Sequence, residues 1–169
     1  FSFVEKPISI RSLTGMPLTV LYSSTGTIVS PWPPSTKVFT SFTDTPNGVL
    51  ITAELSGLPD GALGFHIHET GACTPDFSAA GGHLGSSVDD QAHGFFVADG
   101  PHSGDMANIH VSESGALTVD VFNPRITFSG ENALFDEDGA ALVIHSGPDD
   151  YESQPSGAAG ERIACGVIQ

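Results

Sequence analysis

The sequence predicts an all-β protein, a Greek-key β-sandwich or barrel with two long loops. Short apolar runs recur along the chain, and 20 glycines and 12 prolines are spread between them. This composition is typical of many short strands joined by turns, and no long segment repeats its apolar residues with the helical period. A chain of 169 residues can bury a core of its own, so we expect one main domain, at residues 19–169.

The first predicted element is a β-hairpin. "KVFTSFTD" at 37–44 is followed by the turn sequence "TPNG" and by "VLITAEL" at 49–55. In the second of these runs, alternate residues share one face: Val49, Ile51, Ala53 and Leu55. After the turn sequence "LPDG", we expect a strand at 64–69, "GFHIHE".

Strands are expected again after residue 107. "NIHVSESGALTVDVF" is predicted to be a second hairpin, with its turn at "SESG" and with Leu117, Val119 and Val121 on one face. "ALVIHSG" at 141–147 and "RIACGVI" at 162–168 are the last two predicted strands. The two long loops lie between these elements, at 70–107 and 146–161. Loops of such length are usually functional or disordered.

The N-terminal part of the chain has no clear pattern. Residues 1–18 are predicted to be an extension of unknown role, and the proline-rich "SPWPPST" at 30–36 interrupts any strand around it. The first residues lack an initiator methionine and a signal-peptide pattern, so we expect the chain to begin after processing. No apolar run reaches the 18 residues of a membrane span.

The charge of the chain limits its partners. Twenty acidic residues against 5 basic ones give a formal net charge of -15, which argues against nucleic acid or an anionic membrane as a partner. Because cations are so few, Arg162 would be the main positive charge of any site that contained it. The two cysteines, Cys73 and Cys165, are compatible with one long-range disulfide or with two buried thiols.

Two histidines stand one residue apart in the strand at 64–69. His66 and His68 should point to the same side of this strand, while Phe65 and Ile67 point towards a core. Two imidazoles that converge in this way suit a metal ion. The alternative is a pair of solvated histidines on the wet face of the strand, which is the commoner situation for an isolated His-x-His pair.

The other histidines favour the metal. His83, His93, His102 and Asp105 give three imidazoles and a carboxylate on one loop, which suits tetrahedral zinc. An all-nitrogen set suited to copper comes from His66, His68 and His145 with a share of His83. The seventh histidine, His110, is predicted to be a solvated strand residue outside both sets.

Five segments together resemble the copper/zinc superoxide dismutase family, nearer its bacterial extracytoplasmic branch: "GFHIHETGAC", "AAGGHL", "HSGDMANI", "ALVIHSGPDDY" and "GERIACGVI". The resemblance covers about residues 37–169. It implies an immunoglobulin-like sandwich and an enzyme that disproportionates superoxide into dioxygen and hydrogen peroxide. It also implies a location outside the cytoplasm, whether periplasmic, surface-associated or secreted.

The resemblance also implies a role for each site residue. Copper would be bound by His66, His68, His83 and His145, and zinc by His83, His93, His102 and Asp105. His83 would bridge the metals and take part in catalysis, and Arg162 would guide the anion to the copper. Asp149 would hydrogen-bond a ligand of each metal, and Cys73 and Cys165 would form the family's disulfide.

Some alternatives remain open at this point. A non-catalytic copper/zinc-binding or metal-delivery protein could share the fold, although its usual sign, missing copper ligands, is absent here. A hydrolase with Glu69 as its base is disfavoured because Glu69 should face away from His68. The spacing between His83 and His93 departs from the family pattern, and the loop at 146–161 has no lysine or arginine. Both a homodimer and a monomer are compatible with the sequence.

Overall fold

The computed structural model describes residues 19–20, 36–87, 91–130 and 133–169. The predicted extension at 1–18 and all but the last residue of the proline-rich segment lie outside these described residues. The strands are β1 (Thr19–Val20), β2 (Lys37–Thr45), β3 (Gly48–Ser56), β4 (Gly61–Leu63), β5 (Phe65–His68), β6 (Ile109–Val111), β7 (Leu117–Asn123), β8 (Ala140–His145) and β9 (Arg162–Ile168). A short 3₁₀ helix, η1 (Phe77–Ala80), lies in the first long loop. None of the helical structure in the described ranges is long and apolar enough to cross a membrane.

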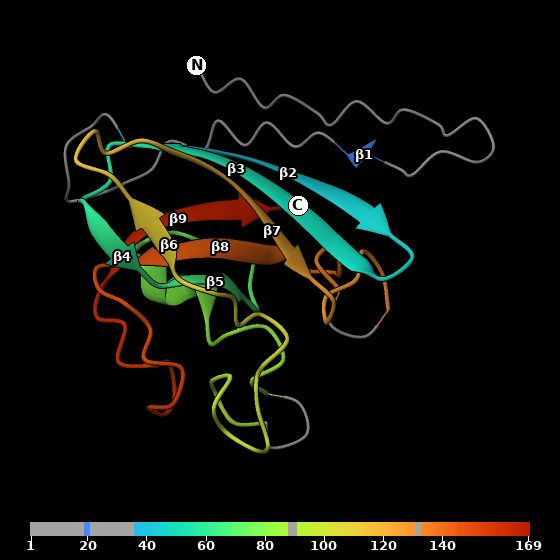
Figure 1. The fold of residues 1–169 in the computed structure, drawn as a ribbon. Coiled ribbons are helices and arrows are strands. Elements are labelled where there is room, and N and C mark those ends of the chain that lie inside the picture. The colour runs from blue at the N-terminus through green and yellow to red at the C-terminus, as the bar shows by residue number, and fades with distance from the viewer. Residues whose placement is uncertain (1–18, 21–35, 88–90, 131–132) are drawn as a thin grey trace.

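Antiparallel pairing groups the strands into two larger sheets and a small one. The first sheet has the order β1-β2-β3-β7, the second has the order β5-β8-β9, and β4 pairs with β6 (Figure 1). Several neighbours, such as β3 and β7, are not consecutive in the chain, so the chain crosses between sheets as in a Greek key. The predicted all-β sandwich is therefore confirmed.

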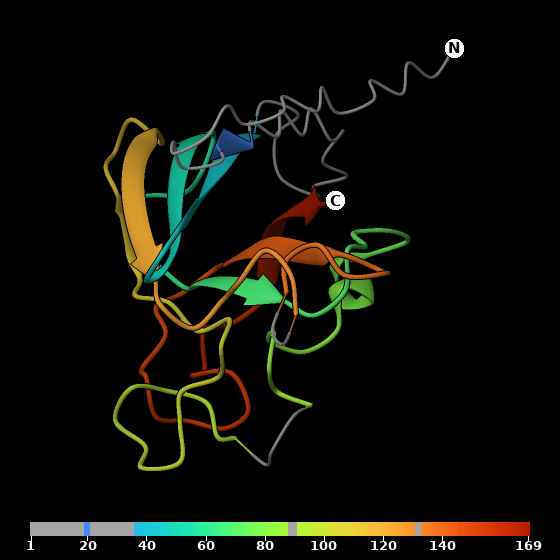
Figure 2. The ribbon, with the colours of Figure 1, turned by 90° about the vertical axis from the view of Figure 1, so that its right-hand side faces the viewer.

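The hydrophobic core lies between the two larger sheets, which form separate layers in Figure 2. Val38, Phe42 and Ile51 enter it from the first sheet, and Phe65 and Leu142 enter it from the second. These side chains are buried because alternate residues of each strand face the opposite sheet. The strands thus form a framework around this core.

The first predicted hairpin is present, and the second is not. β2 and β3 pair along their whole length, from Lys37 opposite Ser56 to Thr45 opposite Gly48. β6 does not pair with β7: β6 pairs with β4, and β7 pairs with β3. The prediction of a hairpin across "SESG" was therefore wrong, because this turn carries the chain from one sheet to another.

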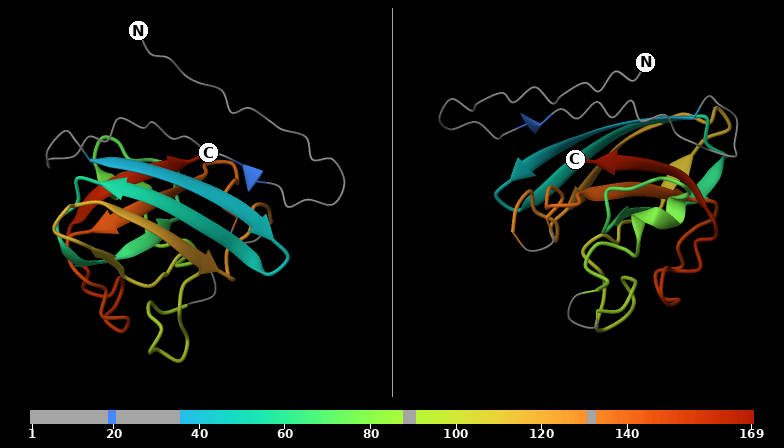
Figure 3. Two further views of the ribbon diagram at one scale, coloured as in Figure 1. Left: turned by 45° about the horizontal axis from the view of Figure 1, so that its top comes forward. Right: turned by 180° about the vertical axis from the view of Figure 1, so that it is seen from behind.

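Both long loops cover the face of the second sheet that is turned away from the core (Figure 3). Hydrogen bonds connect them directly; for example, the N–H of Phe96 donates to the carbonyl oxygen of Tyr151 over 3.2 Å. The loops therefore form a layer of their own, below β5 and β8 in Figure 1. Any side chain that β5 or β8 points away from the core meets this layer.

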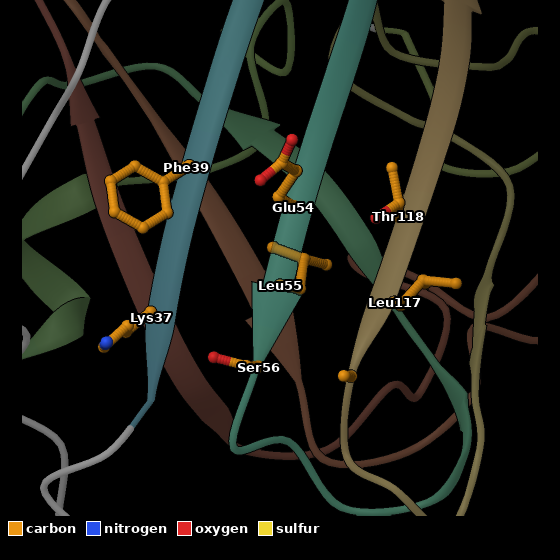
Figure 4. A pocket seen from close by; sticks show the side chains of 8 residues that line it. Lys37, Phe39, Glu54, Leu55, Ser56, Leu117 and Thr118 are labelled. Atoms are coloured by element: carbon orange, nitrogen blue, oxygen red, sulfur yellow. The ribbon is translucent and has the colours of Figure 1, made fainter.

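The outer face of the first sheet carries a groove (Figure 4). Its lining comes from β2, β3 and β7 and the residue before β7: Lys37, Phe39, Glu54, Leu55, Ser56, Ala116, Leu117 and Thr118. The groove lies on the side of this sheet that faces away from the core. It is therefore separate from the histidine-bearing face of the second sheet.

Candidate metal centre

The two histidines of β5 face the loop layer. Phe65 and Ile67 belong to the core cluster, whereas His66 and His68 lie on the other face of the strand. Because the loops cover this face, both histidines are buried, with 0 % exposure. The alternative of two solvated histidines is therefore wrong.

Two more histidines complete the first group. His145 is the last residue of β8 and follows a register shift between Ile144 and His145. His83 lies in the first long loop and forms an isolated bridge with His68. One ligand atom from each of four buried histidines lies within 4.8 Å of the others: His66, His68, His83 and His145.

The second group lies in the first long loop. It consists of His83, His93, His102 and Asp105, all buried and again with ligand atoms within 4.8 Å of one another. Oδ1 of Asp105 lies 2.7 Å from Nδ1 of His83, 3.0 Å from Nδ1 of His93 and 3.4 Å from Nδ1 of His102. His83 belongs to both groups, so the two groups form one centre with a shared member.

The unpaired nitrogens of these histidines test whether metals fit. Each of the six histidines has one buried ring nitrogen with no hydrogen-bond partner: His66 Nδ1, His68 Nε2, His83 Nε2, His93 Nδ1, His102 Nδ1 and His145 Nε2. Leaving one such atom without a partner costs about 1–3 kcal/mol, so six unpartnered nitrogens in one place indicate a binding site. The all-imidazole group fits copper, and the group with a carboxylate fits zinc.

Carbonyl oxygens hold the opposite ring nitrogen of three histidines. Nδ1 of His68 lies 3.0 Å from the carbonyl oxygen of Gly81, and Nδ1 of His145 lies 3.2 Å from that of Gly160. Nε2 of His102 lies 3.0 Å from the carbonyl oxygen of Gln91. A carbonyl can only accept, so each of these nitrogens carries the proton. The unpaired nitrogen of each ring is left with a free lone pair for a metal.

Asp149 connects the two groups. Its Oδ2 lies 2.8 Å from Nε2 of His66, and its Oδ1 lies 2.9 Å from Nε2 of His93. Burial would raise the pKa of Asp149, but the hydrogen bonds from these two histidines hold that pKa well below its usual range. The carboxylate therefore stays ionised and fixes the orientation of one ring in each group.

The histidines of the first group are neutral. Burial lowers the pKa of His68 to about 2, and it lowers the pKa values of His83 and His145 to about 4. His93 differs: burial would lower its pKa, but the carboxylates of Asp105 and Asp149 raise it to about 9. A neutral imidazole is the form that binds a metal, so the first group is ready to bind. His93 must lose a proton to bind zinc.

Arg162, the first residue of β9, reaches back to the first long loop. Its Nη1 donates to the carbonyl oxygen of Phe77 over 2.6 Å, and its Nη2 donates to that of Gly81 over 2.7 Å. Gly81 is also the partner of His68. The guanidinium is thus fixed beside the first group and is only partly buried.

Cys73 and Cys165 form a disulfide, so the family's bond is present and the two-thiol alternative is wrong. The bond joins the first long loop to β9, across 92 positions of sequence. Phe77 and Ala80 of η1 pack beside it, against Val143 of β8. The loop segment that carries the partners of Arg162 is therefore attached to the strand framework.

Two residues near Asp149 were missed by sequence reasoning. The side-chain amide of Asn108 accepts from the N–H of Asp149 and donates to its carbonyl oxygen, both over 2.8 Å. Gly157 has φ of +67°, and a Cβ there would lie 1.8 Å from Oδ1 of Asp149. An amide side chain in a loop has no sequence signature, and Gly157 is one of 20 glycines, so neither residue stands out in the sequence.

Two other residues are outside the centre. His110 is exposed on β6, as predicted. The Oε1 of Glu69 accepts from the N–H of Gly82 over 3.0 Å. Glu69 is in neither ligand group, so the geometry does not favour a hydrolase.

The model of one protein family, copper/zinc superoxide dismutase, matches residues 36–168. The chain belongs to this family. The resemblance found in the sequence is thereby confirmed, and the matched range includes every member of the two histidine groups.

Bacterial superoxide dismutases are similar over most of the chain. A Cu-Zn superoxide dismutase of Aquifex aeolicus is 52% identical over 129 residues, which is 74% of this chain and 75% of the relative. The Cu-Zn superoxide dismutase of Caulobacter vibrioides is 43% identical over 131 residues, 75% of each chain. Among solved structures, a double mutant of a superoxide dismutase-like protein from Bacillus subtilis matches with a TM-score of 0.73 and 37% identity. That match covers 78% of this chain and 88% of the other.

Proposed function

We propose that the two histidine groups act as one catalytic centre, with copper in the first group and zinc in the second. The enzyme converts superoxide into dioxygen and hydrogen peroxide, the reaction of its family, and its cofactors are copper and zinc. The copper ligands would be His66, His68, His83 and His145, and the zinc ligands His83, His93, His102 and Asp105. The observation that carries this assignment is that His83 belongs to both groups.

When bound, copper supplies the alternating one-electron oxidation and reduction that the reaction requires, and zinc supplies a fixed positive charge without redox chemistry. The protein holds the ring of His83 between the groups. Its Nδ1 faces Asp105 in the second group, and its Nε2 is buried without a hydrogen-bond partner. Each turnover consumes two protons, and Nε2 of His83 is an atom that can hold one of them.

Arg162 supplies the positive charge for the anionic substrate. Its guanidinium is always protonated, and its position beside His68 is fixed by two carbonyl oxygens. The loop at 146–161, which precedes Arg162, has no lysine or arginine, so attraction at short range depends on Arg162 and the metals. The guanidinium has five N–H donors, so the hydrogen bonds to the two carbonyls leave others that can donate to a diatomic anion.

We infer that the protein works outside the cytoplasm. Disulfides persist in oxidising compartments, and the disulfide between Cys73 and Cys165 holds the loop beside Arg162. Reduction of this bond would loosen the segment that positions the guanidinium. An oxidising location therefore suits the geometry of the site.

The test is the decay of superoxide after pulse radiolysis, with protein of known copper and zinc content. We expect a rate proportional to bound copper and close to the diffusion limit. The variant His68→Ala should lose copper and activity but retain zinc. His110→Ala is the matched control, because it removes an exposed histidine from outside the centre.

Two results would contradict the proposal. If the protein binds copper fully and does not accelerate the decay, it is a metal-binding or metal-delivery protein. If His68→Ala keeps both copper and activity, the copper ligands have been assigned wrongly.

A further inference from the structure

The side chain of Gln154 binds both main-chain groups of His93. The N–H of His93 donates to Oε1 of Gln154 over 2.8 Å, and Nε2 of Gln154 donates to the carbonyl oxygen of His93 over 2.8 Å. Nε2 also donates to the carbonyl oxygen of Glu152 over 2.9 Å, which fixes the orientation of the amide. Gln154 is in the second long loop, 61 positions after His93. The amide thus ties one loop to the other.

His93 needs such an attachment more than the ligands on strands do. The main chains of His66 and His68 are part of the ladder between β5 and β8. His93 is not in a strand, and within the described ranges its main chain makes hydrogen bonds with Gln154 alone. Its N–H and carbonyl therefore have their positions set by the second loop.

The ring of His93 lies close to two carboxylates, so a small displacement of its main chain would change the geometry of the second group. Its Nε2 lies 2.9 Å from Oδ1 of Asp149, and its unpartnered Nδ1 lies 3.0 Å from Oδ1 of Asp105. A displaced main chain would move Nδ1 away from the other ligand atoms of the second group. Because ligands must converge on one point to bind zinc, such a shift weakens binding.

We propose that Gln154 is a positioning residue that sets the zinc affinity of the enzyme by fixing the main chain of His93. This inference rests on the proposed function, in which His93 is a zinc ligand. Asn108 makes the same two-way contact with the main chain of Asp149, so amide side chains hold both partners of the bond between Asp149 and His93. Gln154 is the member of this arrangement that acts on a ligand directly.

Gln154 is also well suited to a test. Its side chain is exposed, so replacing it leaves no cavity in the core. The variant Gln154→Ala removes the side chain, and Gln154→Met keeps its length while removing the donor and the acceptor. Ser156→Ala is the matched control, because it trims an uncharged residue of the same loop. The side chain of Ser156 makes no hydrogen bond with the described residues.

The experiment measures the dissociation constants for zinc and for copper in metal-free protein by competition with a chromophoric chelator. We expect Gln154→Ala and Gln154→Met to raise the dissociation constant for zinc about 10-fold. The dissociation constant for copper should stay unchanged, as should both constants in Ser156→Ala. Hydrogen exchange of the His93 amide in the metal-free protein should be faster in both Gln154 variants.

Three results would overturn the inference. The first is an unchanged affinity for zinc in both Gln154 variants, and the second is a wild-type affinity for zinc in Gln154→Met alone. The third is an equal loss of affinity for zinc and for copper, which would indicate that the whole centre is disturbed. The variant His93→Ala separates this failure from failure of the proposed function. If His93→Ala binds zinc as tightly as the wild type, the ligand assignment is wrong. If it binds zinc weakly and the Gln154 variants do not, only the role of Gln154 is refuted.

Discussion

Arg162 and His68 share one hydrogen-bond acceptor. The carbonyl oxygen of Gly81 lies 2.7 Å from Nη2 of Arg162 and 3.0 Å from Nδ1 of His68. The proposed anion-binding group and a proposed copper ligand are therefore held in position by the same oxygen atom. A change in one of them can be made without removing the partner of the other.

Replacing Arg162 should slow the capture of superoxide and leave the metals in place. We expect Arg162→Leu to lower kcat/KM by about 10-fold or more, because electrostatic steering of this kind is worth about 10 to 10³ in rate. Arg162→Lys should recover part of the rate, since the charge returns without the planar fork. The check is pulse radiolysis with metal content measured on the same samples. Loss of copper in Arg162→Leu would show a structural role instead.

The rate should fall with rising ionic strength. The net charge of -15 repels an anion at long range, but at physiological salt only charges within about 8 Å of the site act strongly. Arg162 and the metals dominate at that distance. The measurement is kcat/KM over a range of salt concentrations, with Arg162→Leu expected to show a smaller decrease. A rate that increased steadily with salt would show that the acidic surface outweighs the local attraction.

Asp149 should control the affinity for both metals. In Asp149→Asn, one oxygen remains to accept from a histidine, and the amide nitrogen cannot accept from the other. We expect the affinities for zinc and copper to fall about 10- to 100-fold, the usual effect of losing such a partner. Asp150→Asn makes the same change at an exposed neighbour and should leave both affinities unchanged. If both substitutions lowered the affinities equally, Asp149 would act only through its negative charge and not through its hydrogen bonds to the histidines.

The disulfide should contribute strongly to the stability of the metal-free protein. Closing a loop of 92 positions is worth about 4–5 kcal/mol in the loop-entropy model. The double variant Cys73→Ser with Cys165→Ser should lower the free energy of unfolding by about this amount. Denaturation with urea, with a chelator present throughout, checks this. A loss below about 1 kcal/mol would show that the unfolded chain is already compact.

The metal-free protein should be most stable near pH 6.5. Burial lowers the folded pKa values of His83 and His145 to about 4, against 6.5 in the unfolded chain. As the pH falls from 6.5 towards 4, the unfolded chain binds protons that the folded protein does not, so stability is lost. His93 acts in the opposite direction. Its pKa is raised to about 9, so its contribution is complete below pH 6.5 and is lost as the pH rises towards 9.

Thermal unfolding from pH 4.5 to 9 in the presence of chelator checks this profile. His93→Ala should flatten the alkaline side and leave the acidic side in place. A Tm that did not change between pH 6.5 and 4.5 would contradict the assignment of neutral, buried histidines.

Much of the fold followed from local patterns. Alternation in "VLITAEL" and the turn "TPNG" predicted the pairing of β2 and β3. Pairing across the fold did not follow from such patterns. "SESG" has the composition of a hairpin turn, yet β6 and β7 enter different sheets. The three residues of β4 are too few to show any alternation.

The candidate centre was predictable to a similar degree. Residue types and order indicated both groups, since histidines and an aspartate next to strands are unusual enough to be noticed. The supporting contacts were not predictable. Asn108 and Gln154 act through hydrogen bonds between their side-chain amides and the main chain, and these partners come together only when distant segments of the chain pack against each other. Polar loop residues of this kind are common in any sequence.

The two groups are built from different kinds of structure. His66, His68 and His145 are on strands of the second sheet, whereas all members of the second group are in the first long loop. Lengthening a loop adds little closure entropy, while shifting a strand by one residue turns its side chains to the other face. In evolutionary terms, the second group can accept insertions and deletions between His83 and His93, whereas a one-residue change within β5 or β8 would turn histidines of the first group away from the centre.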